Sequence, residues 1–141
     1  MRDKPEIERK LRSLAEYLGE LEQISQATYK QYQASFQIKR TAERLIQLVV
    51  EVATDVNGLL IVGLGETPPK DYFTSFIKLS QLSVLPDAFA QVLAPTTAIR
   101  NRLVHAYDTV DDRLVYASIK PILEEFTQYL DIIRKYVQKQ P

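Results

Sequence analysis

Apolar residues recur at intervals of three and four along most of this chain, and this spacing limits the fold more than any other feature. It runs through residues 2–24, through about 27–60, and from the loop at 108–112 to about Gln138. An α-helix turns by roughly 100° per residue, so this spacing gathers apolar side chains on one face. The sequence therefore predicts an all-α fold, an antiparallel bundle of four main helices plus a short one, in a single domain over residues 1–141.

Local signals place the ends of these helices. Caps and prolines mark helix starts, because a side-chain oxygen can accept from a free N–H and because proline has no N–H to donate. We expect Pro95 to kink or split the fourth helix. The expected starts are Ser25 for the long second helix, Lys70 or Asp71 for the third, Pro86 for the fourth, and a capping box of Thr109 with Asp112 for the last.

Composition excludes several classes of function. Eighteen basic and eighteen acidic residues cancel, so no overall positive field draws in nucleic acid, and an RNA contact has to be local. The absence of cysteine excludes disulfides and thiolate metal sites, and a single histidine excludes a histidine-rich metal site within one chain. The longest apolar run, Gly58 to Gly65, is too short to span a bilayer. We expect a soluble cytoplasmic protein without membrane contact, metal or cofactor.

The stretch from Arg100 to Asp108 holds the only histidine, His105. Histidine carries protons near neutral pH, and the planar fork of arginine suits phosphate oxygens. On a helix, Arg100 and His105 lie roughly 140° apart and about 7.5 Å along the axis. Asn101 lies between them and shares the His105 face. These three residues can therefore line one polar cleft, while Leu103 turns toward apolar partners.

The pattern Arg100-Asn101-x-Leu103-Val104-His105-x-Tyr107 resembles the signature of the HEPN superfamily, which is arginine, four to six residues, then histidine. The form R-N-x-L-V-H-x-Y is similar to that of the HepT-like toxins of prokaryotic toxin–antitoxin pairs. The likeness covers most of the chain. It includes the segment Ala42–Gln47, the acids Glu51 and Asp55, the turn at Pro68-Pro69 and the Tyr-Phe-Thr-Ser-Phe segment that follows.

The resemblance implies an endoribonuclease toxin that needs no metal. RNA supplies its own nucleophile, the 2′-hydroxyl, so the protein needs a base, an acid and a cation for the phosphorane charge. One histidine fills one proton role, and a two-fold dimer presents two copies of it. The resemblance likewise implies a cleft at the interface of a homodimer, or of a higher even oligomer. His105 is then the base or acid, and Arg100 clamps the phosphate. Asn101 orients either His105 or the phosphate.

Three further residues take their candidate roles from the resemblance. Tyr107 corresponds to the tyrosine to which a nucleotidyltransferase antitoxin attaches AMP in HepT-like toxins, and the added anion would block RNA. Glu51 and Asp55 are secondary candidates beside the cleft. These two carboxylates, one helical turn apart, could instead hold Mg²⁺.

Simpler interpretations stay open. A single histidine near a helix end is more often a surface or capping residue, and the polar stripe with Glu51 and Asp55 fits a solvated face. Tyr107 fits an amphipathic residue at a helix end. The chain could also be a non-catalytic helical subunit that docks a nucleotidyltransferase and positions its substrate. Cleavage of RNA without metal separates this alternative from the enzyme.

Overall fold

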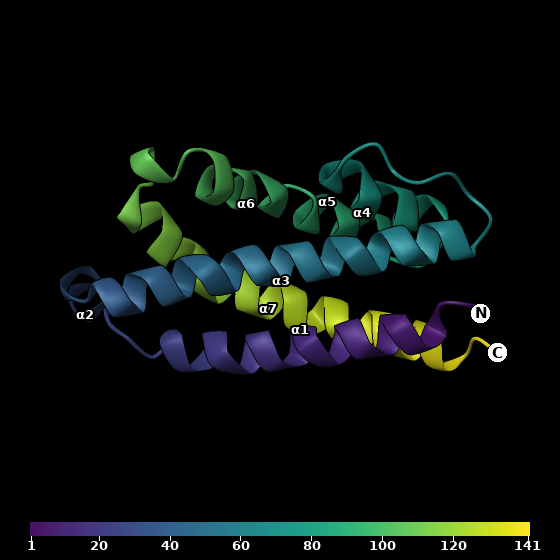
Figure 1. Ribbon diagram of the computed structural model, residues 1–141, viewed down its shortest axis with the longest axis horizontal. Helices are drawn as coiled ribbons and strands as arrows, with labels where there is room; N and C mark the ends of the chain where they lie inside the picture. Colours follow the sequence, from purple (N-terminus) through teal and green to yellow (C-terminus); the bar gives the residue numbers. More distant parts are fainter.

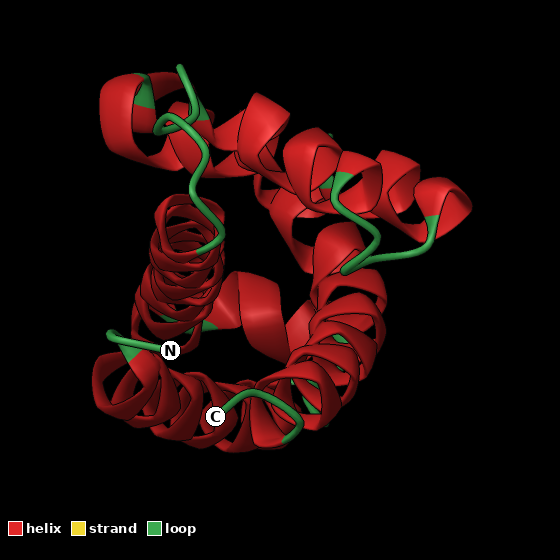
Figure 2. Ribbon diagram, turned by 90° about the vertical axis from the view of Figure 1, so that its right-hand side faces the viewer, coloured by secondary structure: helices red, strands yellow, loops and turns green.

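The computed structural model describes residues 1–141 and contains helices and loops but no strand (Figures 1 and 2). The predicted all-α helical bundle is thus confirmed. The long helices are α1 (Lys4–Ile24), α3 (Phe36–Gly63) and α7 (Asp112–Gln138). The shorter ones are α2 (Tyr29–Ala34), α4 (Tyr72–Gln81), α5 (Asp87–Leu93), α6 (Thr96–His105) and the 3-10 helix η1 (Tyr107–Thr109).

The three short helices α4, α5 and α6 together fill the place of one main helix. They follow one another along α3 and return the chain to the end of the bundle where α2 lies (Figure 1). Helix α3 packs against α1, α4, α6 and α7, so it occupies the centre of the arrangement. The two termini meet at the opposite end, where the Met1 amino group donates to the Pro141 backbone oxygen at 2.6 Å.

Several predicted boundaries are confirmed. Asp71 caps α4: its Oδ1 accepts from the Thr74 backbone N–H at 2.7 Å. Pro86 precedes α5, and Pro95 separates α5 from α6 as its missing N–H predicts. Helix α7 ends at Gln138 and contains Pro121.

Other boundaries were predicted wrongly. The stretch 27–60 is two helices, because Ser35 leaves the helical conformation (φ −124°, ψ 110°) and its Oγ accepts from the Ile38 N–H at 3.2 Å. Ser25 caps no helix start; its hydroxyl donates back to the Glu22 carbonyl, and Thr28 caps α2 instead. The box at Thr109 is also absent, because Asp111 caps α7.

The core is one cluster of 30 buried apolar residues contributed by helices from both halves of the chain. A polar chain crosses it between α3, α4 and α7. Tyr129 donates to Asn57 Oδ1 at 2.6 Å and to the Ala53 carbonyl at 3.0 Å, and Asn57 Nδ2 donates to Ser75 Oγ at 2.9 Å. Because Tyr129, Asn57 and Ser75 are all hydrogen-bonded to one another or to the backbone, these bonds fix the relative positions of the three helices.

Helix α3 has the length and apolar composition of a membrane span, with a mean hydropathy of 1.8 over its most apolar window. Its longest unbroken apolar run is too short for a span, because Glu51 and Asp55 interrupt the apolar residues of α3. In the structure 56% of that window is buried inside the bundle. The apolar character of α3 is therefore that of a core helix surrounded by four others.

Candidate active site

Arg100 is held by a carboxylate from a neighbouring helix. It lies in α6, and Glu51 of α3 faces it across the contact between the two helices. Nε and one terminal nitrogen of Arg100 both donate to Glu51 Oε2, at 2.9 and 2.6 Å. The side chains are 15% and 24% exposed, so the pair is shielded from solvent without being sealed off. Both groups are therefore fixed at the edge of the core.

Two N–H donors of Arg100 have no acceptor within the chain. A guanidinium has five N–H donors, one on Nε and two on each terminal nitrogen. Glu51 takes the Nε donor and one from Nη2, and Asn101 Oδ1 accepts one from Nη1 at 3.2 Å. One N–H on each terminal nitrogen is left. Two adjacent donors of this kind match two oxygens of a phosphate.

An aromatic ring supports the same guanidinium. The central carbon of Arg100 lies 4.8 Å from the centroid of the Tyr72 ring, at the start of α4. This distance is typical of a cation–π contact. Glu51 of α3 thus restrains the guanidinium of Arg100 through hydrogen bonds in its plane. Tyr72 of α4 restrains it through contact with its flat face.

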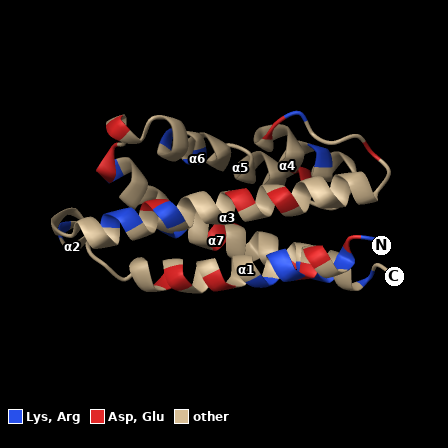
Figure 3. Ribbon diagram, in the orientation of Figure 1, with Lys and Arg blue, Asp and Glu red and all other residues tan.

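Glu51 carries a negative charge, because burial raises its pKa less than the groups that donate to its carboxylate and the nearby arginines lower it. Burial raises the pKa of Glu51, but hydrogen bonds from Arg100 and Gln47 and the charges of Arg100 and Arg44 lower it, leaving the pKa below its ordinary value of 4.5. Gln47 Nε2 donates to the same Oε2 at 3.1 Å. Figure 3 shows the charges along α3: basic residues occupy its N-terminal half, and acids lie at its middle.

His105 is the last residue of α6 and is exposed. Its side chain makes no hydrogen bond within the chain, so the fold leaves both ring nitrogens available. Asn101, also exposed, bonds to Arg100 and not to His105. The structure therefore joins Arg100, Asn101 and Glu51 in one hydrogen-bonded group, with His105 about one turn further along the same helix.

Tyr107 projects from the short 3-10 helix that follows α6. Its side chain is 76% exposed and makes no hydrogen bond within the chain. Only Ala106 separates it from His105.

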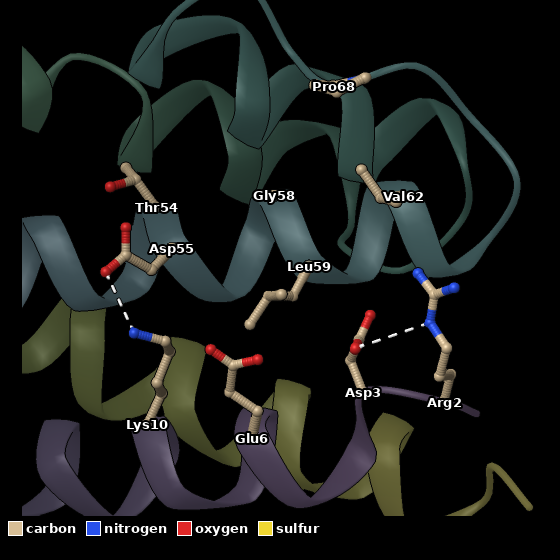
Figure 4. A pocket seen from close by; sticks show the side chains of 10 residues that line it. All are labelled: Arg2, Asp3, Glu6, Lys10, Thr54, Asp55, Gly58, Leu59, Val62 and Pro68. Atoms are coloured by element: carbon tan, nitrogen blue, oxygen red, sulfur yellow. Dashed lines mark hydrogen bonds and ion pairs between the residues drawn. The ribbon is translucent and has the colours of Figure 1, made fainter.

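Asp55 does not join this group. It pairs with Lys10 of α1 at 3.4 Å and lines a groove of about 630 Å³ between α1, α3 and the loop at Pro68 (Figure 4). Neither Arg100 nor His105 lines that groove. Glu51 and Asp55 thus face different cations, and no group of three or more metal-binding side chains includes them.

Two residues of this group were not predicted from the sequence. Tyr72 contacts the Arg100 guanidinium, and Gln47 donates to the Glu51 carboxylate that holds it. The one sequence signal for Tyr72 is its place directly after the cap Asp71, which fixes it at a helix start. Its contact with Arg100 depends on how α4 and α6 pack along α3.

Comparison with known proteins identifies the family and the fold. Residues 14–133 match the family described as ribonuclease HepT-like. The tRNA nuclease HepT of Aphanizomenon flos-aquae (strain 2012/KM1/D3) is 31% identical over 131 residues, which cover 93% of this chain and 89% of that protein.

Solved structures share the fold. YutE, a cytosolic protein of unknown function from Bacillus subtilis, superposes with a TM-score of 0.85 at 22% identity, covering 98% of this chain and 92% of its own. A tri-AMPylated HEPN toxin of Shewanella oneidensis, solved in complex with MNT antitoxin, gives a TM-score of 0.84 at 21% identity, with 96% and 99% covered.

Proposed function

Because the chain belongs to the HepT-like ribonuclease family, we propose that it is the endoribonuclease toxin of a toxin–antitoxin pair and cleaves RNA without a metal. The observation that carries this proposal is the pair of N–H donors on Arg100 that no group of the chain accepts. The Arg100 guanidinium is fixed by Glu51 and still offers one donor on each terminal nitrogen. His105 supplies a proton carrier on the same helix.

The reaction needs only groups that RNA and the protein supply. A base takes the proton of a 2′-hydroxyl, and the 2′-oxygen attacks the adjacent phosphorus. The bond from phosphorus to the 5′-oxygen breaks, and an acid gives that oxygen a proton. Arg100 neutralises the charge that builds on the phosphorane oxygens. The products are a 2′,3′-cyclic phosphate and a 5′-hydroxyl.

A homodimer supplies the second proton carrier. One His105 is the base and its copy is the acid, because a two-fold axis brings the same patch of both subunits together. Exposed apolar side chains support such an interface at the end of the bundle where α6 ends. Phe36 begins α3 and is 71% exposed, and Leu114 in the first turn of α7 is 43% exposed.

We propose Tyr107 as the site at which a nucleotidyltransferase antitoxin silences the enzyme. Its hydroxyl oxygen would form a bond to the α-phosphorus of a nucleoside triphosphate, with release of pyrophosphate and of the hydroxyl proton. An exposed hydroxyl is required for this transfer, and Tyr107 is 76% exposed. The attached anion would repel RNA phosphate beside His105.

Transfer RNA is the substrate class we propose, since the Aphanizomenon relative is described as a tRNA nuclease. The chain has no net charge, so the contact with RNA has to be local. Arg44, exposed on α3 about two turns before Glu51, is available for such a contact, whereas Arg40 pairs with Glu43 at 2.7 Å. We also propose that the chain acts in the cytosol, because the Bacillus subtilis neighbour is described as cytosolic.

The test is the chemistry of the RNA ends. The purified protein is incubated with tRNA in excess chelator, and the fragments are examined for terminal groups. We expect 2′,3′-cyclic phosphates and 5′-hydroxyls. Fragments with 3′-hydroxyl and 5′-phosphate ends would instead indicate that water, and not the 2′-hydroxyl, is the nucleophile. Intact tRNA and intact messenger RNA would favour the alternative, a non-catalytic subunit that docks a nucleotidyltransferase.

A further inference from the structure

We propose that Tyr72 is a positioning residue for Arg100, and that its ring sets the plane in which the guanidinium meets the phosphate. This inference rests on the proposed ribonuclease function for its catalytic consequence. Its structural part, that the ring holds the guanidinium, can be tested without RNA. Tyr72 lies in α4, outside the Arg–His motif and outside α3, so neither of those segments points to it.

The ring completes the restraint that Glu51 begins. Both hydrogen bonds from Arg100 to Glu51 end on one carboxylate oxygen, Oε2. Two bonds to a single oxygen still allow the guanidinium to tilt about that oxygen. The face of Tyr72, 4.8 Å from the central carbon, opposes this tilt. The free donors of Nη1 and Nη2 are thereby held in one orientation.

Tyr72 is itself firmly anchored. It is the first residue of α4, directly after the cap Asp71. Its carbonyl accepts from Ser75 Oγ at 2.7 Å, and Ser75 in turn accepts from Asn57 at 2.9 Å. Asn57 belongs to α3, the helix that also carries Glu51. The backbone of Tyr72 and the helix that carries Glu51 are consequently tied to one another through these two hydrogen bonds.

Such anchoring matters most in the transition state. The phosphorane carries more negative charge than the phosphodiester, so a fixed fork stabilises it more than it stabilises bound RNA. Without the ring, Arg100 keeps its charge but its fork is no longer held in one orientation. Loss of the ring should therefore lower kcat with little change in KM. Misplacement of this kind costs on the order of ten- to a hundredfold in rate.

The experiment compares three single variants. Tyr72→Phe keeps the aromatic face, and its lost hydroxyl makes no hydrogen bond within the chain. Tyr72→Leu removes the face but keeps an apolar side chain. Phe73→Leu is the matched control, because Phe73 is the adjacent aromatic residue, is 47% exposed and is paired with no cation. Thermal unfolding of each variant verifies that it folds.

Two readouts are combined. The first is kcat and KM for RNA cleavage, for which we expect Tyr72→Phe and Phe73→Leu to resemble the wild type and Tyr72→Leu to lose about ten- to a hundredfold in kcat. The second is the NMR resonance of the Arg100 Nε–H proton, which the ring current of Tyr72 displaces. We expect Tyr72→Phe to keep that displacement and Tyr72→Leu to abolish it.

The outcomes separate this inference from the proposed function. If the wild type cleaves no RNA, the function fails, and the NMR comparison alone decides whether the ring holds Arg100. An unchanged Arg100 resonance in Tyr72→Leu overturns the inference whether or not the protein is active. So does a Tyr72→Leu variant as active as Phe73→Leu, or a Tyr72→Phe variant as impaired as Tyr72→Leu.

Discussion

The orientation of the Arg100 side chain depends more on Glu51 and Tyr72 than on its place in the Arg–His motif. The motif itself is visible in the sequence, and so is the polar character of Asn101 and His105. Glu51, 49 residues away on α3, was expected near the cleft only through the resemblance, and its bond to Arg100 was not predicted. Tyr72, on α4, was not expected at all. A motif predicts which atoms can do chemistry, whereas tertiary packing decides how they are held.

Replacement of Arg100 by lysine should disable cleavage. Lysine keeps the charge, but its single ammonium cannot satisfy Glu51 and also present two donors in one plane. We expect kcat/KM for RNA cleavage to fall on the order of a hundredfold, with little change in thermal unfolding. Wild-type activity in Arg100→Lys would mean that a point charge is sufficient and that the fork has no role.

The ion pair of Glu51 should make stability depend on pH. The pKa of Glu51 is lowered in the folded chain, so its stabilising contribution is complete above the ordinary value of 4.5 and is lost as the pH falls through the folded-state pKa. Chemical denaturation of wild type and Glu51→Gln should show a difference in the free energy of unfolding at pH 7. That difference should shrink by pH 3. A difference that stayed constant between these two pH values would contradict the linkage.

At the scale of helices, the sequence predicted most boundaries with a simple local cause. Asp71, Pro86 and Pro95 act within one turn of the chain, and the structure places helix boundaries at all three. The break at Ser35 was missed because apolar residues keep their helical spacing across it. A serine in that place can either continue a helix or cap the next one, and Ser35 caps α3.

The buried polar chain between α3, α4 and α7 should contribute measurably to stability. Tyr129→Phe removes the hydroxyl that donates to Asn57 and leaves a buried amide oxygen without that donor. We expect a loss of about 1–3 kcal/mol in the free energy of unfolding, measured by urea denaturation. Tyr17→Phe is the matched control, because the Tyr17 hydroxyl makes no hydrogen bond in the structure, and it should change stability by less than about 0.5 kcal/mol. Equal effects of the two substitutions would show that the chain of hydrogen bonds adds nothing.

For the whole molecule, helical periodicity was enough to predict the fold class, because each helix must bury one apolar face. It did not predict that α4, α5 and α6 would share the place of one helix, since that depends on three separate turns in the segment after Gly63. It also did not distinguish a core helix from a membrane span in α3, because burial is a property of the assembled bundle.

The proposed composite site requires assembly. A chain with one histidine supplies one proton carrier, so the two-carrier mechanism needs a dimer. Light scattering at micromolar concentration should give a mass of about twice the 16.2 kDa of one chain, or a higher even multiple. A mass of one chain under conditions in which the protein cleaves RNA would rule out the shared site.

The most direct measurement is cleavage of tRNA in excess chelator from pH 5 to 9 by wild type and by His105→Ala. His105 is exposed and makes no hydrogen bond within the chain, so the variant should fold and unfold like the wild type. We predict that the wild type cleaves with an optimum near neutrality, because the mechanism uses one His105 as the base and its copy as the acid, and that His105→Ala loses at least about a hundredfold in rate. Full activity in His105→Ala, or wild-type activity that vanishes in chelator and returns with Mg²⁺, would contradict the account.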